Sequence, residues 1–428
     1  MKLSQLTFLL LIACSITFTG CLKDECAGTT TFIQWNPIYK SLEEIRADIR
    51  VEDARILENP GKLYFYGDYV LINERNEGIH IIDNSDSANP QNISFIAIPG
   101  NVDMAVKDGF LYADNYIDLL TIDIKDPKAP NVVKRTEDVF PPEGIHPELG
   151  LIVAYEEAET TLEIDCFDPR FGLDIFQNID VIFTAEDFGG PVPSADVAGG
   201  SGAESGTGIG GSFARFTIVE DYLYTVDQFN LRVFDIAQID CPEFRNEVSV
   251  GWGIETIFPL KDKLFIGSNN GLFIYDVANP LFPVQLSVFE HARACDPVYV
   301  QGDIAFVTLR DGTACEGFTN QLDVINVANL EAPRLLHTYP MENPHGLAVR
   351  GEELYLCEGA FGFKTFDISD LSTIDENLLN HKKDFNTYDV IAVPNKQVVM
   401  VVGDDGFYQF DTSDPKDLKE LSLIPVNK

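Results

Sequence analysis

Hydrophobic and polar positions alternate in short runs along most of the chain, and one kind of run recurs. An alternating apolar stretch is followed by an acid or amide and then by a polar turn, often with proline. Alternation with a period of two predicts β-strands, so each phrase is interpreted as a strand that ends in a turn. The phrases are GIHIIDNSDSANP from Gly78, LLTIDIKDPKAP from Leu119, LRVFDIAQIDCP from Leu231, LFIYDVANPLFP from Leu272, LDVINVANLEAP from Leu322, FKTFDISDLSTI from Phe363 and FYQFDTSDPKDL from Phe407.

The acid or amide that ends each run occupies a recurring position, and a second polar residue usually follows three positions later. Asp and Asn side chains commonly cap turns by accepting hydrogen bonds from nearby backbone N–H groups. We interpret both sets as turn caps rather than metal ligands, because a calcium loop would gather its acids in one place. The first set is Asp83, Asp123, Asp235, Asp276, Asn326, Asp367 and Asp411, and the second is Asp86, Asp126, Gln238, Asn279, Asn329, Asp370 and Asp414.

A β-hairpin precedes each phrase, as in MAVKDGFLYADN, and a weaker strand follows it, as in PNVVKRTED. Each unit then has four strands, A to D in chain order. Four short strands repeated at roughly 40 to 50 residues are typical of a propeller blade. The sequence therefore predicts an all-β fold, a seven-bladed β-propeller of four-stranded antiparallel blades over residues 55–428. The units are placed at 55–100, 101–142, 212–251, 252–291, 292–341, 342–385 and 386–428.

These phrases resemble those of the LVIVD-repeat proteins, a family of β-propeller surface lipoproteins. The resemblance covers most of the chain from about residue 55 onward. It implies a propeller at the cell surface or in the envelope, and it implies no established enzymatic activity. Propellers serve both binding and catalysis, so the fold alone does not give the function.

Two segments interrupt the repeat. Residues 143–211 are inserted between strand D of the second unit and strand A of the third. Within them, LGLIVAYEEAETTLEIDC is expected to form a strand pair, and the Gly/Ser-rich end GGPVPSADVAGGSGAESGTGIGGS is expected to be mobile. Gly206, Gly208 and Gly211 are spaced as in a dinucleotide loop, but no suitably placed strand precedes them. Residues 21–54 precede the first blade; IYKSLEEIRADI within them is expected to be helical and to pack on an end of the ring.

The first residues predict export and lipidation. Residues 1–20 carry one lysine and then an apolar run too short to span a bilayer, which is the pattern of a signal peptide. The stretch FTGC resembles a bacterial lipobox, with Phe18 where the family usually has leucine, and implies diacylglycerol on Cys21. The following LKDE resembles the surface-export signal of Bacteroidota lipoproteins. The expected location is the outer membrane, at the cell surface, held through the lipid anchor alone.

The chain is strongly acidic, with 68 acidic and 30 basic residues and a formal net charge of −38. Nucleic acid is excluded as a partner because phosphates need a basic surface. Anionic lipid is disfavoured for the same reason, while a basic partner or a cation stays open. No cofactor is predicted, although a bound cation such as calcium is left open.

Six cysteines remain after Cys14 leaves with the signal and Cys21 takes lipid. An even number of cysteines in a protein that works outside the cytosol favours disulfide bonds. Cys295 begins strand A of the fifth unit and Cys315 lies in its long B–C loop RDGTACEGFTNQ, so we predict that these two are paired. The pairing of Cys26, Cys166, Cys241 and Cys357 is left open.

The candidate site is a ring at one mouth of the propeller channel. Strand A is innermost, and the chain enters it from the face that also carries the D–A and B–C loops. A polar residue six positions before each A–B turn would therefore point into that mouth. Either these charges satisfy one another in a wet channel, or they bind a polar ligand or cation. The predicted ring is Lys62, Asp103, Arg215, Thr256 or Glu255, Asp296, His345 and Asp389.

The leading interpretation is a surface-anchored lipoprotein whose propeller binds or scaffolds a protein or glycan through the D–A/B–C face. The alternative is an envelope enzyme, a hydrolase or lyase using channel-mouth carboxylates and His345. Neither H-E-x-x-H nor G-x-S-x-G occurs and the six histidines are scattered, so no catalytic residue is assigned. The third interpretation is a structural protein of the cell envelope. Convergent carboxylates in a deep pocket would favour an enzyme, and exposed aromatics on a shallow face would favour binding.

Overall fold

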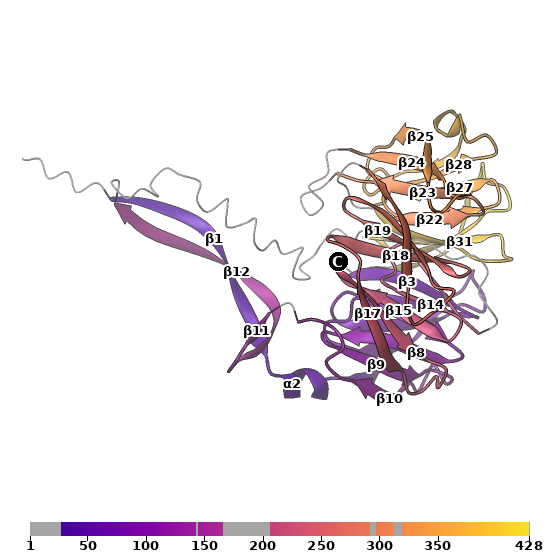
Figure 1. Ribbon diagram of the computed structural model, residues 1–428. Helices are drawn as coiled ribbons and strands as arrows, with labels where there is room; N and C mark the ends of the chain where they lie inside the picture. The colour runs from indigo at the N-terminus through magenta and orange to yellow at the C-terminus, as the bar shows by residue number, and fades with distance from the viewer. Residues whose placement is uncertain (1–26, 143, 166–205, 292–296, 312–318, 428) are drawn as a thin grey trace, which may run out of the picture. The chain divides into compact units, whose positions relative to one another are not determined.

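The structure is a computed structural model that describes residues 27–142, 144–165, 206–291, 297–311 and 319–427 (Figure 1). The chain divides into two compact units, residues 1–37 with 155–184 and residues 38–154 with 185–428. The described residues form eight sheets. The predictions for residues 1–20, Cys21, Cys26, Cys166, Cys295, Asp296 and Cys315 lie outside the described residues.

The first sheet of the larger unit has six strands in the order β13-β3-β4-β5-β6-β2. Its middle is an antiparallel meander in which each of four consecutive strands pairs with the next. The other two strands are added at the two edges. The strands are β2 (Arg50–Glu52), β3 (Pro60–Tyr66), β4 (Tyr69–Glu74), β5 (Gly78–Asp83), β6 (Gln91–Ala97) and β13 (Ile209–Gly210).

Six further sheets have four strands each, and each is the same meander. The first three are β7 (Met104–Lys107), β8 (Phe110–Asn115), β9 (Asp118–Asp123) and β10 (Asn131–Thr136); β14 (Phe216–Val219), β15 (Tyr222–Val226), β16 (Asn230–Asp235) and β17 (Glu243–Ser249); and β18 (Ile254–Leu260), β19 (Lys263–Ser268), β20 (Gly271–Asp276) and β21 (Val284–Glu290). The last three are β22 (Val298–Gln301), β23 (Ile304–Leu309), β24 (Gln321–Asn326) and β25 (Arg334–Pro340); β26 (Leu347–Arg350), β27 (Glu353–Cys357), β28 (Phe363–Asp367) and β29 (Leu378–Lys382), with the short 3₁₀-helix η1 (Ile374–Glu376); and β30 (Thr387–Ala392), β31 (Val398–Gly403), β32 (Gly406–Asp411) and β33 (Lys419–Pro425).

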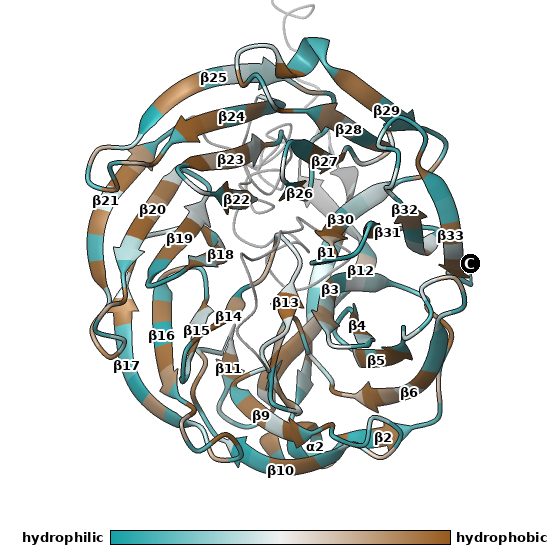
Figure 2. Cartoon of the chain, turned by 90° about the vertical axis from the view of Figure 1, so that its right-hand side faces the viewer, coloured by the Kyte–Doolittle hydropathy of each residue, from teal (hydrophilic) through white to brown (hydrophobic). Residues whose placement is uncertain are grey.

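These sheets close into a ring. The first strand of each sheet contacts the first strand of the next, and the last of them, β30, contacts β3. Figure 2 shows the first strands around the middle of the ring and the last strands, such as β10, β21 and β33, along its rim. The predicted all-β architecture of four-stranded antiparallel sheets arranged as a propeller is confirmed.

The recurring acids and amides cap turns, as the sequence predicted. At every position of the first set, the side-chain oxygen accepts a hydrogen bond from the backbone N–H two residues further on, at 2.7–3.0 Å. Asp86, Asp126, Asn329, Asp370 and Asp414 of the second set do the same. Each phrase therefore ends its strand through local chemistry that repeats around the ring.

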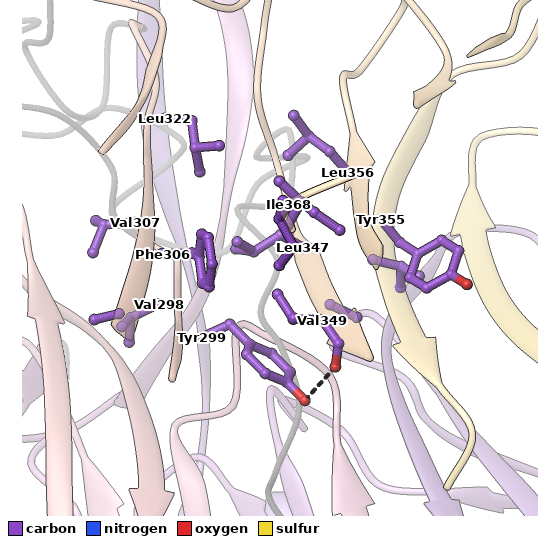
Figure 3. Close-up of a cluster of buried hydrophobic side chains, with 14 of the residues drawn as sticks. Val298, Tyr299, Phe306, Val307, Leu322, Leu347, Val349, Tyr355, Leu356 and Ile368 are labelled. Atoms are coloured by element: carbon purple, nitrogen blue, oxygen red, sulfur yellow. Dashed lines mark hydrogen bonds between the residues drawn. The ribbon is translucent and has the colours of Figure 1, made fainter. Parts of the chain in front are cut away.

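The hydrophobic core lies between neighbouring sheets, which is why consecutive residues of a middle strand are buried on both faces. In β5, for example, the residues Gly78 to Ile82 are all buried. Figure 3 shows one such layer, where Tyr299 and Phe306 of one sheet lie beside Leu347 and Val349 of the next. The Tyr299 hydroxyl donates a hydrogen bond of 2.8 Å to the Val349 carbonyl, so the core also carries a polar bond between sheets.

The segment before the first sheet forms a strand and a short helix. β1 (Ala27–Lys40) is followed by α2 (Leu42–Ala47), which begins with a capping box between Ser41 and Glu44. Ile45 is buried with Ile117 and Leu151, and the Arg46 guanidinium donates to both oxygens of Asp118 at 2.8 and 2.9 Å. Ile117 lies in the turn between β8 and β9, so α2 packs on the D–A/B–C face, as expected for this segment.

The long strand of the insertion differs from the prediction. Residues 150–165 form one strand, β12 (Gly150–Asp165), rather than a pair. It lies between β1 and β11 (Ile145–His146) in a three-stranded sheet. The Thr31 and Thr161 hydroxyls are 3.1 Å apart, on the two long strands β1 and β12 that lie side by side in Figure 1. The partner strand comes from more than one hundred residues away, which the local alternation of residues 150–165 does not reveal. The predicted helix likewise shrinks to α2 because its first residues belong to β1.

Candidate functional site

The described members of the predicted ring lie at one end of the first strands. Each sits at or just before the N-terminal end of its strand, which is the D–A/B–C face. In β18 the register shifts between Ile254 and Thr256, so Glu255 is an extra residue in the strand, as the alternative at this position anticipated. The placements are Lys62 in β3, Asp103 before β7, Arg215 before β14, Glu255 and Thr256 in β18, His345 before β26 and Asp389 in β30.

Lys62, Asp103 and Arg215 come together at one side of the channel. The Lys62 ammonium lies 2.9 Å from Asp103 Oδ2, and both groups are largely buried. The same oxygen accepts the backbone N–H groups of Arg215 and, at 3.2 Å, Phe216. Burial lowers the pKa of Lys62, the Asp103 charge opposes this, and the Arg215 charge lowers the pKa further.

A further carboxylate that the sequence did not single out lies behind Asp103. Asp114, the fifth residue of β8, accepts the backbone N–H groups of Val102 and Asp103 at 3.0 and 2.8 Å. Burial raises the pKa of Asp114 to about 6; the two backbone hydrogen bonds oppose this and the Asp103 charge adds to it. The pKa of this side chain therefore lies well above the ordinary range of an aspartate.

Asp389 and His345 lie at another side. Asp389 is fully buried, and its Oδ1 accepts the backbone N–H of Ser212 at 3.2 Å. The Ser212 hydroxyl in turn accepts the N–H of Leu347 at 3.0 Å. His345 is buried with Nη1 of Arg310 2.8 Å from its Nδ1, and its ring centroid is 5.5 Å from that of Tyr388. Whether these residues bind a ligand or catalyse a reaction stays a prediction.

The two sides are joined by residues 206–215, which we call the threading segment. Its first part lies at the opposite end of the ring, where Gly206 accepts the N–H of Asp108 in the A–B turn at 2.7 Å. It then runs along β3, with Ile209 opposite Phe65 and Gly210 opposite Tyr64. It ends at the D–A/B–C face, where Ala214 accepts the N–H of Ile257 at 2.9 Å. Figure 2 shows β13 in the middle of the ring.

The course of this segment corrects two expectations. Residues 206–211 were expected to be mobile, but they pair with the channel wall. The insertion was also expected to stay on the D–A/B–C face, but it leaves the second sheet there and returns from the opposite end, through the channel. The glycines at 206, 208 and 211 were the one feature of the sequence that could have indicated this course, because all three lie against the wall of the channel.

The glycines are needed because the walls leave no room for a side chain. A Cβ atom on Gly211 would lie 1.7 Å from Asp389 Oδ2, and one on Gly208 would lie 2.2 Å from Cε1 of Tyr64. Gly206 has φ +102°, which L side chains rarely adopt, and its Cβ would lie 1.9 Å from Asp108 Oδ1. The spacing that resembles a dinucleotide loop therefore lets the backbone of the segment lie directly against the side chains of Asp108, Tyr64 and Asp389.

Large aromatic side chains are exposed on the D–A/B–C face. Trp252, in the connection from β17 to β18, is 54% exposed; Phe229 and Phe361, in B–C turns, are 46% and 47% exposed. The connection that carries Trp252 is held on both sides. Val250 donates its N–H to the Phe229 carbonyl at 2.9 Å, and Gly253 accepts the N–H of Asn269 at 2.8 Å. The rings are thus presented on hydrogen-bonded loops.

The predicted disulfide between Cys295 and Cys315 lies outside the described residues. Of the cysteines whose pairing was left open, Cys241 is a free thiol of intermediate exposure and Cys357 is buried in β27. In the described part of the chain, no three His, Cys, Asp or Glu side chains are placed to hold a metal ion. Of the helices described, none has the length and apolar composition to cross a membrane.

A closed ring of four-stranded antiparallel sheets defines the class of β-propellers. Comparison with protein families matches the LVIVD repeat at residues 61–95 and 100–138, so the chain contains LVIVD repeats, as its phrases suggested. These residues span the first two meanders of the ring. Among curated proteins, none matches the sequence.

Several solved structures are similar to this chain at low sequence identity. The computationally designed protein Ika8 has a TM-score of 0.50 and 9% identity, over 86% of this chain and 90% of that one. A putative 6-phosphogluconolactonase from Bacteroides fragilis has 0.49 and 11%, over 86% and 96%. BamB from Moraxella catarrhalis has 0.47 and 8%, over 90% and 97%. Likeness at this identity concerns the fold alone.

Proposed function

We propose that the protein is a surface-anchored binding propeller that contacts a protein or glycan partner through its D–A/B–C face. The observation that carries the proposal is the set of exposed aromatic rings on that face. Tryptophan and other aromatic residues are enriched at protein interfaces, and they dominate binding energy where they are buried at the centre of a contact. Trp252 and Phe229 suit this role because the loops that carry them are hydrogen-bonded to each other.

Rigid presentation matters for affinity. A ring on a mobile loop would lose conformational entropy on binding, whereas a ring on a fixed loop has already lost it. The net charge of −38 further favours a basic protein or a neutral glycan over an acidic partner.

The experiment compares two variants that remove exposed aromatic rings from opposite faces. Trp252→Ala with Phe229→Ala removes the exposed rings of the D–A/B–C face. Phe282→Ala, in the turn between β20 and β21, removes a ring that is 62% exposed at the other end of the sheet. Crosslinking on intact cells and a glycan array give two separate readouts for the partner class.

The double variant is expected to lose binding about 10–100-fold in one of the two readouts, as for interface hot spots. The Phe282→Ala variant is expected to bind as the wild type does. Equal binding by the wild type and the double variant in both readouts would overturn the proposal, provided that the melting temperature Tm is unchanged.

The anchoring part of the proposal has its own test. Replacing Cys21 by alanine should release the protein from the membrane or leave its signal uncleaved. Replacing Lys23, Asp24 and Glu25 by alanine should keep the lipid and abolish digestion by protease added to intact cells. A lipidated wild-type protein that is protected from protease in whole cells would overturn surface exposure alone.

We further propose that the ring has seven blades. The support is that the recurring phrase occurs once in each of the seven meanders that begin with β3, β7, β14, β18, β22, β26 and β30. The remaining sheet, β11 with β1 and β12, contains none of the phrases. Negative-stain images of the ring viewed along its axis would count the blades directly.

A further inference from the structure

The threading segment joins sheets that are far apart around the ring. Its residues bond to β3, β7, β18, β26 and β30, or to residues directly before them. Gly208 donates its N–H to Val106 at 3.0 Å at one end. At the other end Ala214 bonds to Ile257 and Arg215 to Asp103. A single strand of backbone thus ties five sheets from inside the channel.

The threading segment matters for the place where the first and last sheets of the ring meet, which we call the seam. In the described residues, the first and last sheets share no strand. Their seam is held by packing of β3 on β30, by the Asn84–Gln409 side-chain pair at 2.7 and 3.0 Å, and by the N–H of Asn427, which bonds to Leu57 at 2.9 Å. Neighbouring sheets elsewhere in the described ring also share no strand, but a chain connection joins them, and this seam has none.

Two consecutive residues of the threading segment bridge this seam. Gly211 donates its N–H to the Leu63 carbonyl of the first sheet at 2.9 Å. Ser212 donates its N–H to Asp389 of the last sheet, and its hydroxyl accepts from Leu347 of the sheet before it. The segment therefore connects the two sides of the seam through backbone groups that are buried and satisfied.

The ring carboxylates are engaged by the same segment. Asp103 Oδ2 accepts the backbone N–H groups of Arg215 and Phe216 as well as the Lys62 ammonium, and Asp103 Oδ1 accepts the N–H of Met104 at 2.6 Å. Asp389 Oδ1 accepts from Ser212 and, at 2.8 Å, from Val390. Hydrogen bonds to a charged acceptor are the strong ones, so carboxylates at these positions hold the segment firmly.

We propose that residues 206–215 are an internal pin that locks the propeller ring, and that Asp103, Asp389 and Ser212 anchor this pin rather than an external ligand. The insertion then has a structural task at its C-terminal end that is independent of partner binding. The channel is occupied by the chain itself, so a partner meets the propeller at its faces.

The first test is amide hydrogen exchange of the full chain, followed by mass spectrometry. Peptides that cover residues 206–216 are expected to exchange about as slowly as peptides of β3, because most of the N–H groups between residues 208 and 216 donate hydrogen bonds to the channel wall. Exchange of residues 206–216 within seconds, as in an exposed turn, would overturn the proposal without any substitution.

The second test displaces the pin. Gly211→Ala places a Cβ against Asp389, and is expected to lower Tm on the order of 5 °C and to speed exchange in both β3 and β30. Gly251→Ala is the matched control, since the nearest atom to its Cβ is Cζ of Phe273 at 3.2 Å. It should lower Tm by much less than Gly211→Ala does, because only a ring tip has to shift, and it should leave exchange in β3 and β30 unchanged. If Tm is unchanged and exchange is faster only in residues 206–216, the segment does not stabilise the ring and the proposal is wrong.

If Gly211→Ala yields no folded protein, the variant Ser212→Ala tests the proposal instead. It removes only the hydroxyl that accepts the N–H of Leu347, and it is expected to speed exchange at the start of β26 and in β30. No change in exchange at either strand would overturn the anchoring role. Loss of partner binding in the variant Trp252→Ala with Phe229→Ala at unchanged Tm is a separate result, because neither residue belongs to the pin.

Discussion

Asp114 should make the stability of the protein depend on pH between about 4 and 7. Its carboxylate is partly buried and accepts the backbone N–H groups of Val102 and Asp103 together with the Asn101 amide. Burial raises its pKa from 3.8 to about 6. The folded state therefore holds the Asp114 proton more tightly than the unfolded state does.

The sign and size of the effect follow from this difference. A carboxylate with a raised pKa is destabilising when it is ionised, so the cost is present above about pH 6 and is lost as the pH falls toward 4. The folded and unfolded pKa values differ by about 2 units, and at about 1.4 kcal/mol per unit this gives at most about 3 kcal/mol. Partial exposure of Asp114 brings the expected value toward 1–2 kcal/mol, roughly half of that maximum.

The variant Asp114→Asn removes the charge with little change in shape. Its amide oxygen can keep the bonds that Oδ1 accepts from Asn101, Val102 and Asp103, and its NH₂ replaces Oδ2, which accepts only from Val102 at 3.2 Å. Urea unfolding at pH 5, 6, 7 and 8 measures the free energy of unfolding of both proteins. Because about half of the effect is already present at pH 5, the variant should gain about 0.5–1.5 kcal/mol relative to the wild type between pH 5 and pH 8.

A suitable control is Asp83→Asn in an exposed turn. Hydrogen bonds from the Ser85 side chain and backbone lower the pKa of Asp83, so its titration lies below this pH range. Its effect on stability should be the same at all four pH values. A constant difference between wild type and Asp114→Asn from pH 5 to pH 8 would refute the reasoning about Asp114.

Three further outcomes are expected. Phe363→Ala removes a fully buried ring from the core and should lower the free energy of unfolding by about 3–5 kcal/mol in urea; a loss below about 1 kcal/mol would mean that this core collapses around the gap. Arg46→Ala should cost about 1–3 kcal/mol in the same assay because buried Asp118 loses two charged hydrogen bonds; an unchanged value would show that α2 contributes nothing there. Non-reducing peptide mapping should find Cys295 joined to Cys315, with loss of the bond costing at most about 2–4 kcal/mol; two free thiols would exclude the bond.

The propeller architecture could be predicted because its signals are local and repeated. Alternation with a period of two gave the strands, and a capping residue such as Asp235 or Asp276 marked where each strand turns. The register of these runs was also enough to place Lys62, Asp103 and Asp389 at the starts of their strands. A single copy of the phrase is weak evidence for a propeller blade, but several copies in the same register strengthen the prediction.

The candidate site was predictable only in part. The sequence placed polar residues around one mouth, but it did not show that Asp103 and Asp389 would accept backbone groups of the insertion. Trp252 was missed as well, although it stands between Gly251 and Gly253 in a connection between blades and is one of two tryptophans in the chain. Its exposure depends on the hydrogen bonds of its loop to two neighbouring turns.

The sequence by itself determined the strands, their turns and their grouping into four-stranded units, because each depends on residues that are close together in the chain. Only the tertiary structure decided that β12 pairs with β1 and that residues 206–215 pass through the channel. Both arrangements join residues separated by more than one hundred positions, as in the contacts of Ser212 with Asp389 and of Thr31 with Thr161. Such contacts leave no period in the sequence, since their energy comes from surfaces that exist only once the sheets have formed.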